Sequence, residues 1–143
     1  MAKNRYQKKT RLIGVPELAK KFKELSFVFD ETPFEDFLHS QGESLKEKIK
    51  SELRRETKRD TGNLERSIVA KKYGKKVAGS PKVFVGIDYS VAFYAYMVEY
   101  GHGGPHPAPA HSFWRKPVRG NASSIAGNIE KEALKFINKT AVK

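Results

Sequence analysis

Three histidines lie close together in a stretch rich in glycine and proline. His102, His106 and His111 have three and four residues between them. Imidazole nitrogens are common metal ligands, so the spacing raises the hypothesis of a metal site and, with it, a metal-dependent hydrolase. Glu99 is the only nearby carboxylate that could complete such a site. We favour a plain or pH-sensitive loop, and we expect no metal and no cofactor.

Glu99 itself lies among apolar neighbours and is expected to be partly buried. A buried carboxylate without a partner is costly, so we expect it to meet Arg115, Arg66, a backbone N–H group or a neighbouring subunit. The absence of cysteine excludes thiol nucleophiles and disulfides. No carboxylate pair has a spacing that indicates acid–base catalysis, and no phosphate-binding glycine motif occurs. The chain is therefore predicted not to be an enzyme.

The basic residues could bind an acidic partner. The chain has 143 residues and a formal net charge of +12, and residues 66–87 contain six basic side chains and no acid. Contacts with DNA phosphates would be independent of sequence and sensitive to salt, but contact with an acidic protein is the interpretation that we favour. The candidate contact residues are Lys71, Lys72, Lys75, Lys76 and Lys82.

The sign of the charge changes along the N-terminal third of the chain. The first eleven residues carry five basic side chains and no acid, whereas residues 26–43 carry five acids and no lysine or arginine. Such a change of sign suits head-to-tail contacts between copies of one subunit. Residues 1–15 are predicted to form a flexible basic arm, and residues 16–143 a single α+β domain. No apolar run is long enough for a signal peptide or a membrane span.

The elements that would position these residues begin with helices. Leu18, Phe22 and Leu25 predict a short helix after Pro16, and the following connection contains Phe27-Val28-Phe29, which we expect to be buried. A long amphipathic helix is predicted over residues 33–57, with Thr32 as its cap and a possible break at Gly42. Its apolar stripe consists of Phe34, Phe37, Leu38, Gln41, Leu45, Ile49 and Leu53.

A basic β-hairpin is predicted next. Residues 60–64 indicate a turn, residues 67–73 favour a strand, and residues 74–76 are a plausible hairpin tip. Val77-Ala78 and residues 83–87 would supply the return strand, so the expected sheet is small and antiparallel.

The C-terminal half mixes aromatic and flexible segments. Residues 89–100 favour a short helix, and the glycines and prolines of residues 101–111 are expected to exclude regular structure. Residues 113–117 should form an anchored extended segment. A last helix is predicted to begin at Ser123 or Ser124, with an apolar stripe of Ile125, Ile129, Ala133, Phe136 and Ile137.

Three motifs in order carry a family resemblance. They are D-T-G-N-L-E-R-S-I at residues 60–68, Y-A-Y-M-V-E-Y-G at residues 94–101 and P-A-H-S-F-W-R-K-P at residues 109–117. In this order and spacing they resemble the minor tail-component or tail-completion family of long-tailed phages. The resemblance covers about residues 16–137.

The resemblance implies a non-enzymatic virion protein, made in the host cytoplasm, that works at the neck or tail. It further implies an α+β subunit that assembles as a homo-oligomeric ring, expected to be a hexamer, between the head connector and the tail tube or its terminator. No membrane contact is implied, and the ring would surround the path of the genomic DNA. The side chains expected in the core or in subunit contacts are Tyr94, Tyr96, Glu99, Phe113, Trp114 and Arg115. The alternative is a sequence-independent nucleic-acid-binding protein that uses the basic ribbon.

Overall fold

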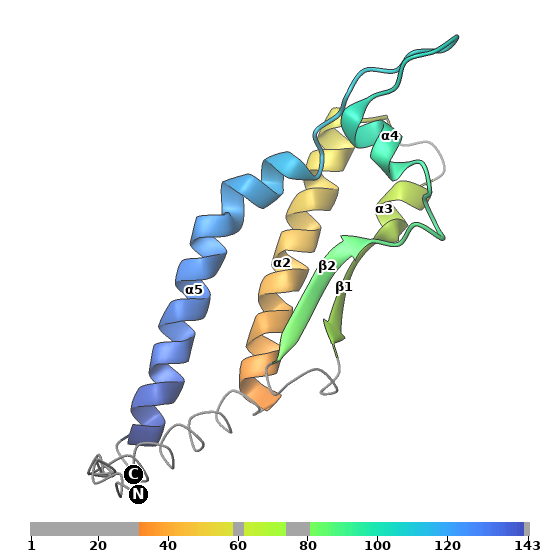
Figure 1. Ribbon diagram of the computed structural model, residues 1–143. Coiled ribbons are helices and arrows are strands. Elements are labelled where there is room, and N and C mark those ends of the chain that lie inside the picture. The colour runs from red at the N-terminus through yellow and green to blue at the C-terminus, as the bar shows by residue number, and fades with distance from the viewer. Residues whose placement is uncertain (1–31, 59–61, 74–80, 142–143) are drawn as a thin grey trace, which may run out of the picture.

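The computed structural model describes residues 32–58, 62–73 and 81–141. The predictions for residues 1–31, for Asp60 and Thr61, and for the hairpin tip at residues 74–80 lie outside this part of the chain. The elements form the predicted α+β fold, in the order α2 (Thr32–Glu56), α3 (Asn63–Ser67), β1 (Ile68–Tyr73), β2 (Lys82–Ile87), α4 (Ala95–Tyr100) and α5 (Arg115–Ala141). Figure 1 shows α2 with α5 on one side and the two strands on the other.

The predicted long helix is confirmed as α2. Phe34, Ile49 and Leu53 of its apolar stripe are buried, and Arg54 and Arg55 lie in its last turn. There they complement the negative end of the helix dipole. Within the described ranges, no helix combines the length and the apolar character needed to cross a membrane.

The sheet packs closely against α2 at Gly42. The helix continues through this residue, so the break considered from sequence does not occur. A Cβ atom at Gly42 would lie 2.7 Å from Cγ1 of Val83 and 3.3 Å from Cγ2 of Val85. Glycine is therefore used here because it lets two valines of β2 pack directly on the helix backbone.

Glycine-to-alanine substitutions at Gly42 of α2 and Gly127 of α5 are expected to change the stability in opposite directions. Gly42→Ala gains helix propensity but forces β-branched, stiff Val83 out of its position, so we expect a net loss of about 1 to 2 kcal/mol in the free energy of unfolding. Gly127→Ala on α5 meets nothing within 4 Å, and we expect it to stabilise the chain by roughly 0.5 to 1 kcal/mol. Urea denaturation of both variants measures the difference. A stabilised Gly42→Ala variant would contradict the close packing.

The predicted antiparallel pairing of the hairpin strands is confirmed. Ile68 pairs with Ile87 at one end of the ladder, and Tyr73 pairs with Lys82 at the other. Because side chains alternate along a strand, Ala70, Val83 and Val85 face α2 while their neighbours face away from it. One face of the sheet therefore packs on α2, and the other is directed away from it.

Helix α5 begins well before the predicted position. It starts at Arg115, so the expected start at Ser123 or Ser124 and the extended conformation expected for residues 113–117 are both wrong. Pro117 fits the first turn because its missing N–H group would have had no intrahelical acceptor there. The predicted apolar stripe is half-buried along α5, and Phe136 packs edge-on against Phe34 with ring centroids 5.5 Å apart.

The core lies where α2, the sheet and the start of α5 meet. Ile49 and Leu53 of α2 pack with Ile68 of β1 and with Phe113, which is fully buried just before α5. Half-buried side chains complete this cluster, namely Leu45, Leu64, Val85, Ile87, Val98, Trp114 and Val118. Every described element except the end of α5 therefore depends on the same core.

Candidate functional site

Glu99 joins α4 to the first residues of α5. Glu99 is 4% exposed, and its carboxylate accepts hydrogen bonds from the backbone N–H groups of Trp114 at 2.9 Å and Arg115 at 3.2 Å. It also accepts one from Nε of Arg115 at 2.8 Å. The expectation that Glu99 meets Arg115 and backbone N–H groups is confirmed. The carboxylate stabilises the positive end of the α5 dipole, and this explains why α5 begins so early.

The charge pair extends to two exposed tyrosines. The guanidinium carbon of Arg115 lies 4.4 Å from the ring centre of Tyr100, and Nη2 donates to Oγ of Ser112 at 3.2 Å. Tyr100 in turn packs against Tyr96, with ring centroids 4.5 Å apart. A planar guanidinium over an aromatic face is an attractive arrangement. Glu99 thus holds exposed rings in place through Arg115, and its own oxygens are occupied by donors.

The loop between α4 and α5 is more regular than its composition indicates. His102 and Ala108 form an antiparallel bridge with hydrogen bonds of 3.1 and 2.9 Å, and the N–H of His111 donates to the carbonyl of Val98. The prediction that residues 101–111 exclude regular structure is therefore wrong at this bridge. Gly101 makes the turn possible, because it has a φ of 71° and a Cβ there would lie 2.7 Å from the carbonyl oxygen of Ala108. Figure 1 shows that the loop projects beyond the helices.

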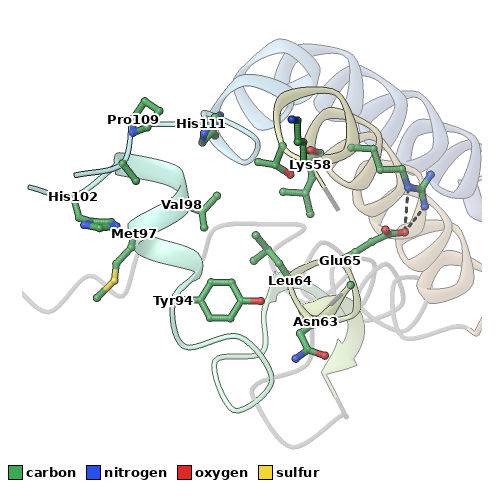
Figure 2. A pocket seen from close by; sticks show the side chains of 15 residues that line it. Lys58, Asn63, Leu64, Glu65, Tyr94, Met97, Val98, His102, Pro109 and His111 are labelled. Atoms are coloured by element: carbon green, nitrogen blue, oxygen red, sulfur yellow. Dashed lines mark hydrogen bonds and ion pairs between the residues drawn. The ribbon is translucent and has the colours of Figure 1, made fainter. Parts of the chain in front are cut away.

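A cavity of about 530 Å³ lies between this loop, α4 and the end of α2. Figure 2 shows Tyr94, Met97 and Val98 on one side and Leu64 on the other. Its lining also includes His102, His111 and Lys58, while Arg54 binds the carboxylate of Glu65. His106 is exposed in the loop. Within the described ranges, no three histidine, aspartate or glutamate side chains are grouped so as to hold a metal ion.

Residues 89–100 expose an unusual amount of apolar surface. The exposed fractions are 56% for Tyr89, 77% for Phe93, 62% for Tyr96 and 49% for Met97. Large apolar side chains that stay exposed are typical of surfaces that bind another protein. We call these four residues the aromatic band. The band and the loop of residues 101–111 form the candidate interaction surface.

The predicted contact residues are found in three settings. Glu99, Trp114 and Arg115 come together in the hydrogen-bond network, whereas Phe113 is part of the core. Tyr94 is half-buried and lines the cavity, and Tyr96 is exposed in the aromatic band. Trp114 packs partly on the core and also lines a groove on the other side of α4. A role for these residues in subunit contacts stays a prediction.

The predicted basic contact residues that the structure describes lie on both faces of the sheet. Lys71 and Lys82 are exposed on the face of the sheet that points away from α2. Lys72 is on the other face and forms an ion pair with Asp36 of α2, and this hydrogen bond raises the pKa of Lys72 above its ordinary value. Lys75 and Lys76 lie outside the described residues. Contact with DNA or with an acidic protein stays a prediction for all five.

Sequence reasoning missed Phe84, Phe93 and Met97 as surface residues. Phe84 could have been found, because it stands between Val83 and Val85 in a strand whose valines must face the same side. Its ring lies over Gly86, where an added Cβ would be 2.1 Å from the ring. The exposure of Phe93 and Met97 has no comparable signal, because residues 89–100 lack a clear period.

The chain matches a known protein family. The family model described as "Bacteriophage HK97-gp10, putative tail-component" matches residues 16–101, which is more than half of the chain. The motifs at residues 60–68 and 94–101 lie within this range, and the motif at residues 109–117 lies beyond it. No curated protein and no solved structure matches.

Proposed function

The chain belongs to the HK97-gp10-like family of bacteriophage tail components, and from this premise we propose that it is a ring-forming neck or tail-completion subunit. In this role it joins the head connector to the tail tube and lies in the virion between them. Its partners are further copies of itself, expected to form a hexamer, and the proteins of the connector and the tube. A tail component is a structural protein of the virion, and its function depends on contact surfaces.

The aromatic band is the observation that supports the proposal most. Tyr89, Phe93, Tyr96 and Met97 are about half or more exposed in the single chain, although α4 itself is held rigidly by Glu99. Burying such side chains against another protein gains roughly 25 cal/mol for each Å² of apolar surface removed from water. Because α4 is already held in one position, little conformational entropy is lost when it associates with a partner. The band is therefore suited to a permanent contact.

Genetic removal of the protein tests the role in joining heads and tails. In the phage that encodes this chain, a nonsense codon in its gene should yield filled heads and free tails, with few joined particles in electron micrographs. Supplying the wild-type chain from a plasmid should restore joining. Normal yields of joined, infective particles without the chain would contradict the proposal.

The aromatic band can be tested in the same complementation assay. Phe93→Asp together with Tyr96→Asp should leave the circular dichroism spectrum unchanged, because both side chains are exposed, but should lower the titre of joined particles by about a hundredfold or more. Leu134→Asp is a matched control, because Leu134 is also an exposed apolar residue, 50% exposed, but lies on α5. Equal loss with Leu134→Asp, or no loss with the band variant, would exclude a special role for the band.

A further inference from the structure

The sheet has an outer face on which cationic and aromatic side chains alternate. Lys71 pairs with Phe84 across the strands, and Tyr73 pairs with Lys82. Tyr73 and Phe84 are 56% and 46% exposed, and their rings contact edge-on at 6.2 Å. Both lysines are exposed as well. Since the alternate residues of both strands face α2, these four side chains are directed away from the body of the fold.

This outer face continues into a groove beside α4. The groove has a volume of about 320 Å³, and its lining includes Phe84, Tyr89, Tyr96, Tyr100 and Trp114. Arg115 lies over the ring of Tyr100, and its charge is balanced by the carboxylate of Glu99. We call Lys71, Tyr73, Lys82, Phe84, Tyr96 and Tyr100 together the cationic aromatic face.

Two carboxylates, Glu99 and Asp88, lie close to this face. Glu99 lines the groove, but both of its oxygens accept hydrogen bonds from Trp114 or Arg115. Asp88 accepts hydrogen bonds from the N–H and the hydroxyl of Ser90, and these bonds, with a smaller effect of the nearby Lys71 charge, lower its pKa and keep it ionised. Within the described ranges, no ion pair involves Lys71 or Lys82. Lys71 and Lys82 are therefore the cations of this face that an acidic partner could pair with.

The chain contains a segment with the complementary chemistry. Residues 27–31 read Phe-Val-Phe-Asp-Glu, and residues 26–43 contain no lysine or arginine. In an extended strand, Phe27 and Phe29 would share one side, at a rise of roughly 3.3 Å per residue. Five such residues span roughly 17 Å, close to the length of the six-residue strands β1 and β2. Two acids and three apolar side chains thus match a face of lysines and aromatic rings.

We propose that the cationic aromatic face of one copy binds residues 27–31 of a second copy. Phenylalanines of the segment lie against Phe84 and Tyr73, and Asp30 and Glu31 form ion pairs with Lys71 and Lys82. Each copy then carries both a donor segment and a receiving face, which is the arrangement that generates a ring when the rotation closes. The inference rests on the proposed assembly function and names the contact that would link its subunits.

A second copy fits better than the same chain. The segment ends at residue 31, directly before α2, and Asp36 of α2 pairs with Lys72 on the inner face of the sheet. A chain that leaves the start of α2 would have to turn around the sheet edge within a few residues to reach the outer face. A neighbouring copy can approach the open face directly.

Photo-crosslinking identifies the occupant. Phe84→p-benzoylphenylalanine is incorporated into particles assembled from equal amounts of ¹⁴N- and ¹⁵N-labelled chains, and the crosslinked peptides are identified by mass spectrometry. Crosslinks between Phe84 and residues 27–31 with mixed isotopes would support the proposal. Crosslinks with matched isotopes only, crosslinks to DNA or to another virion protein, or no crosslinks at all would overturn it.

Charge exchange tests the contact independently. Lys71→Glu with Lys82→Glu, and Asp30→Lys with Glu31→Lys, should each lower incorporation of the chain into particles at least about tenfold, because like charges then face each other. All four substitutions together should restore incorporation to within about threefold of wild type. The control Arg119→Glu with Lys131→Glu makes the same change in net charge as the first variant, on exposed residues of α5.

These outcomes distinguish an error in the proposed contact from an error in the proposed function. If the combined exchange does not restore incorporation although the purified variants unfold cooperatively, the contact is wrong. If the α5 control lowers incorporation as strongly as the sheet variant, the effect is one of net charge and the contact is again wrong. In both cases the nonsense-codon experiment still reports whether the chain joins heads to tails.

Discussion

Phe113→Ala is expected to lower the free energy of unfolding by about 3 to 5 kcal/mol. The side chain is fully buried between Ile49 and Leu53 of α2 and Ile68 of β1, so its removal loses contacts with two elements and leaves a cavity. A loss of this size is a large part of the stability of a small domain. Urea denaturation followed by circular dichroism measures it.

The matched control is Phe93→Ala. Phe93 is 77% exposed and contacts the ring of Tyr94 edge-on. We expect this variant to change the free energy of unfolding by less than about 1 kcal/mol. If both variants lost the same stability, Phe113 would not be the anchor that joins α5 to the core.

Glu99→Gln is expected to cost about 2 to 4 kcal/mol. The substitution keeps the shape of the side chain but leaves Arg115 without its counter-ion and places an NH2 group where donors already point. We reduce the value expected for a fully buried pair, because the side chain of Arg115 is 37% exposed. The free energy of unfolding again provides the measurement.

Glu130→Gln is the control for the charge change. Glu130 is exposed on α5, and none of the ion pairs in the described part of the chain involves it. It should therefore change the stability by less than about 0.5 kcal/mol. Hydrogen exchange adds a local readout: Glu99→Gln should speed exchange of the Trp114 and Arg115 amides far more than that of amides in the middle of α2. A uniform increase would contradict the role of Glu99 in holding the start of α5.

Both predictions concern how the interaction surface is held. Phe113 fixes the start of α5 to the core, and Glu99 fixes α4 to the same point. Lys116 adds a contact from α5 to Glu52 of α2 at 2.9 Å. The aromatic band and the loop at residues 101–111 are therefore presented on a rigid support. Preorganisation of this kind reduces the entropy lost when subunits associate.

Acidic side chains along α2 form ion pairs with basic ones, and the excess positive charge lies on other residues. Along α2, acids are paired with neighbouring bases, as Glu43 is with Lys46 and Glu56 with Lys116, and the hydrogen bonds from these lysines lower the pKa of both carboxylates. These exposed pairs add little stability. Their consequence is that the excess positive charge remains on residues such as Lys71, Lys82 and Arg119.

Much of the fold could be predicted because its signals are local. The stripe from Phe34 to Leu53 repeats at helical spacing, and the strand at residues 68–73 is rich in β-branched and aromatic residues, so α2 and the hairpin were found at nearly correct bounds. The partners of Glu99 were also correctly expected, because a buried carboxylate has few acceptable neighbours.

The sequence by itself determined the family, the long helix, the antiparallel hairpin and the need to neutralise Glu99. The tertiary structure decided that α5 starts at Arg115, that Gly42 serves close packing and that Phe93 and Tyr96 remain exposed. The physical reason is the range of the interactions. Periodicity and capping act within a few residues, whereas the start of α5 depends on a carboxylate sixteen residues earlier and Gly42 on valines of a distant strand.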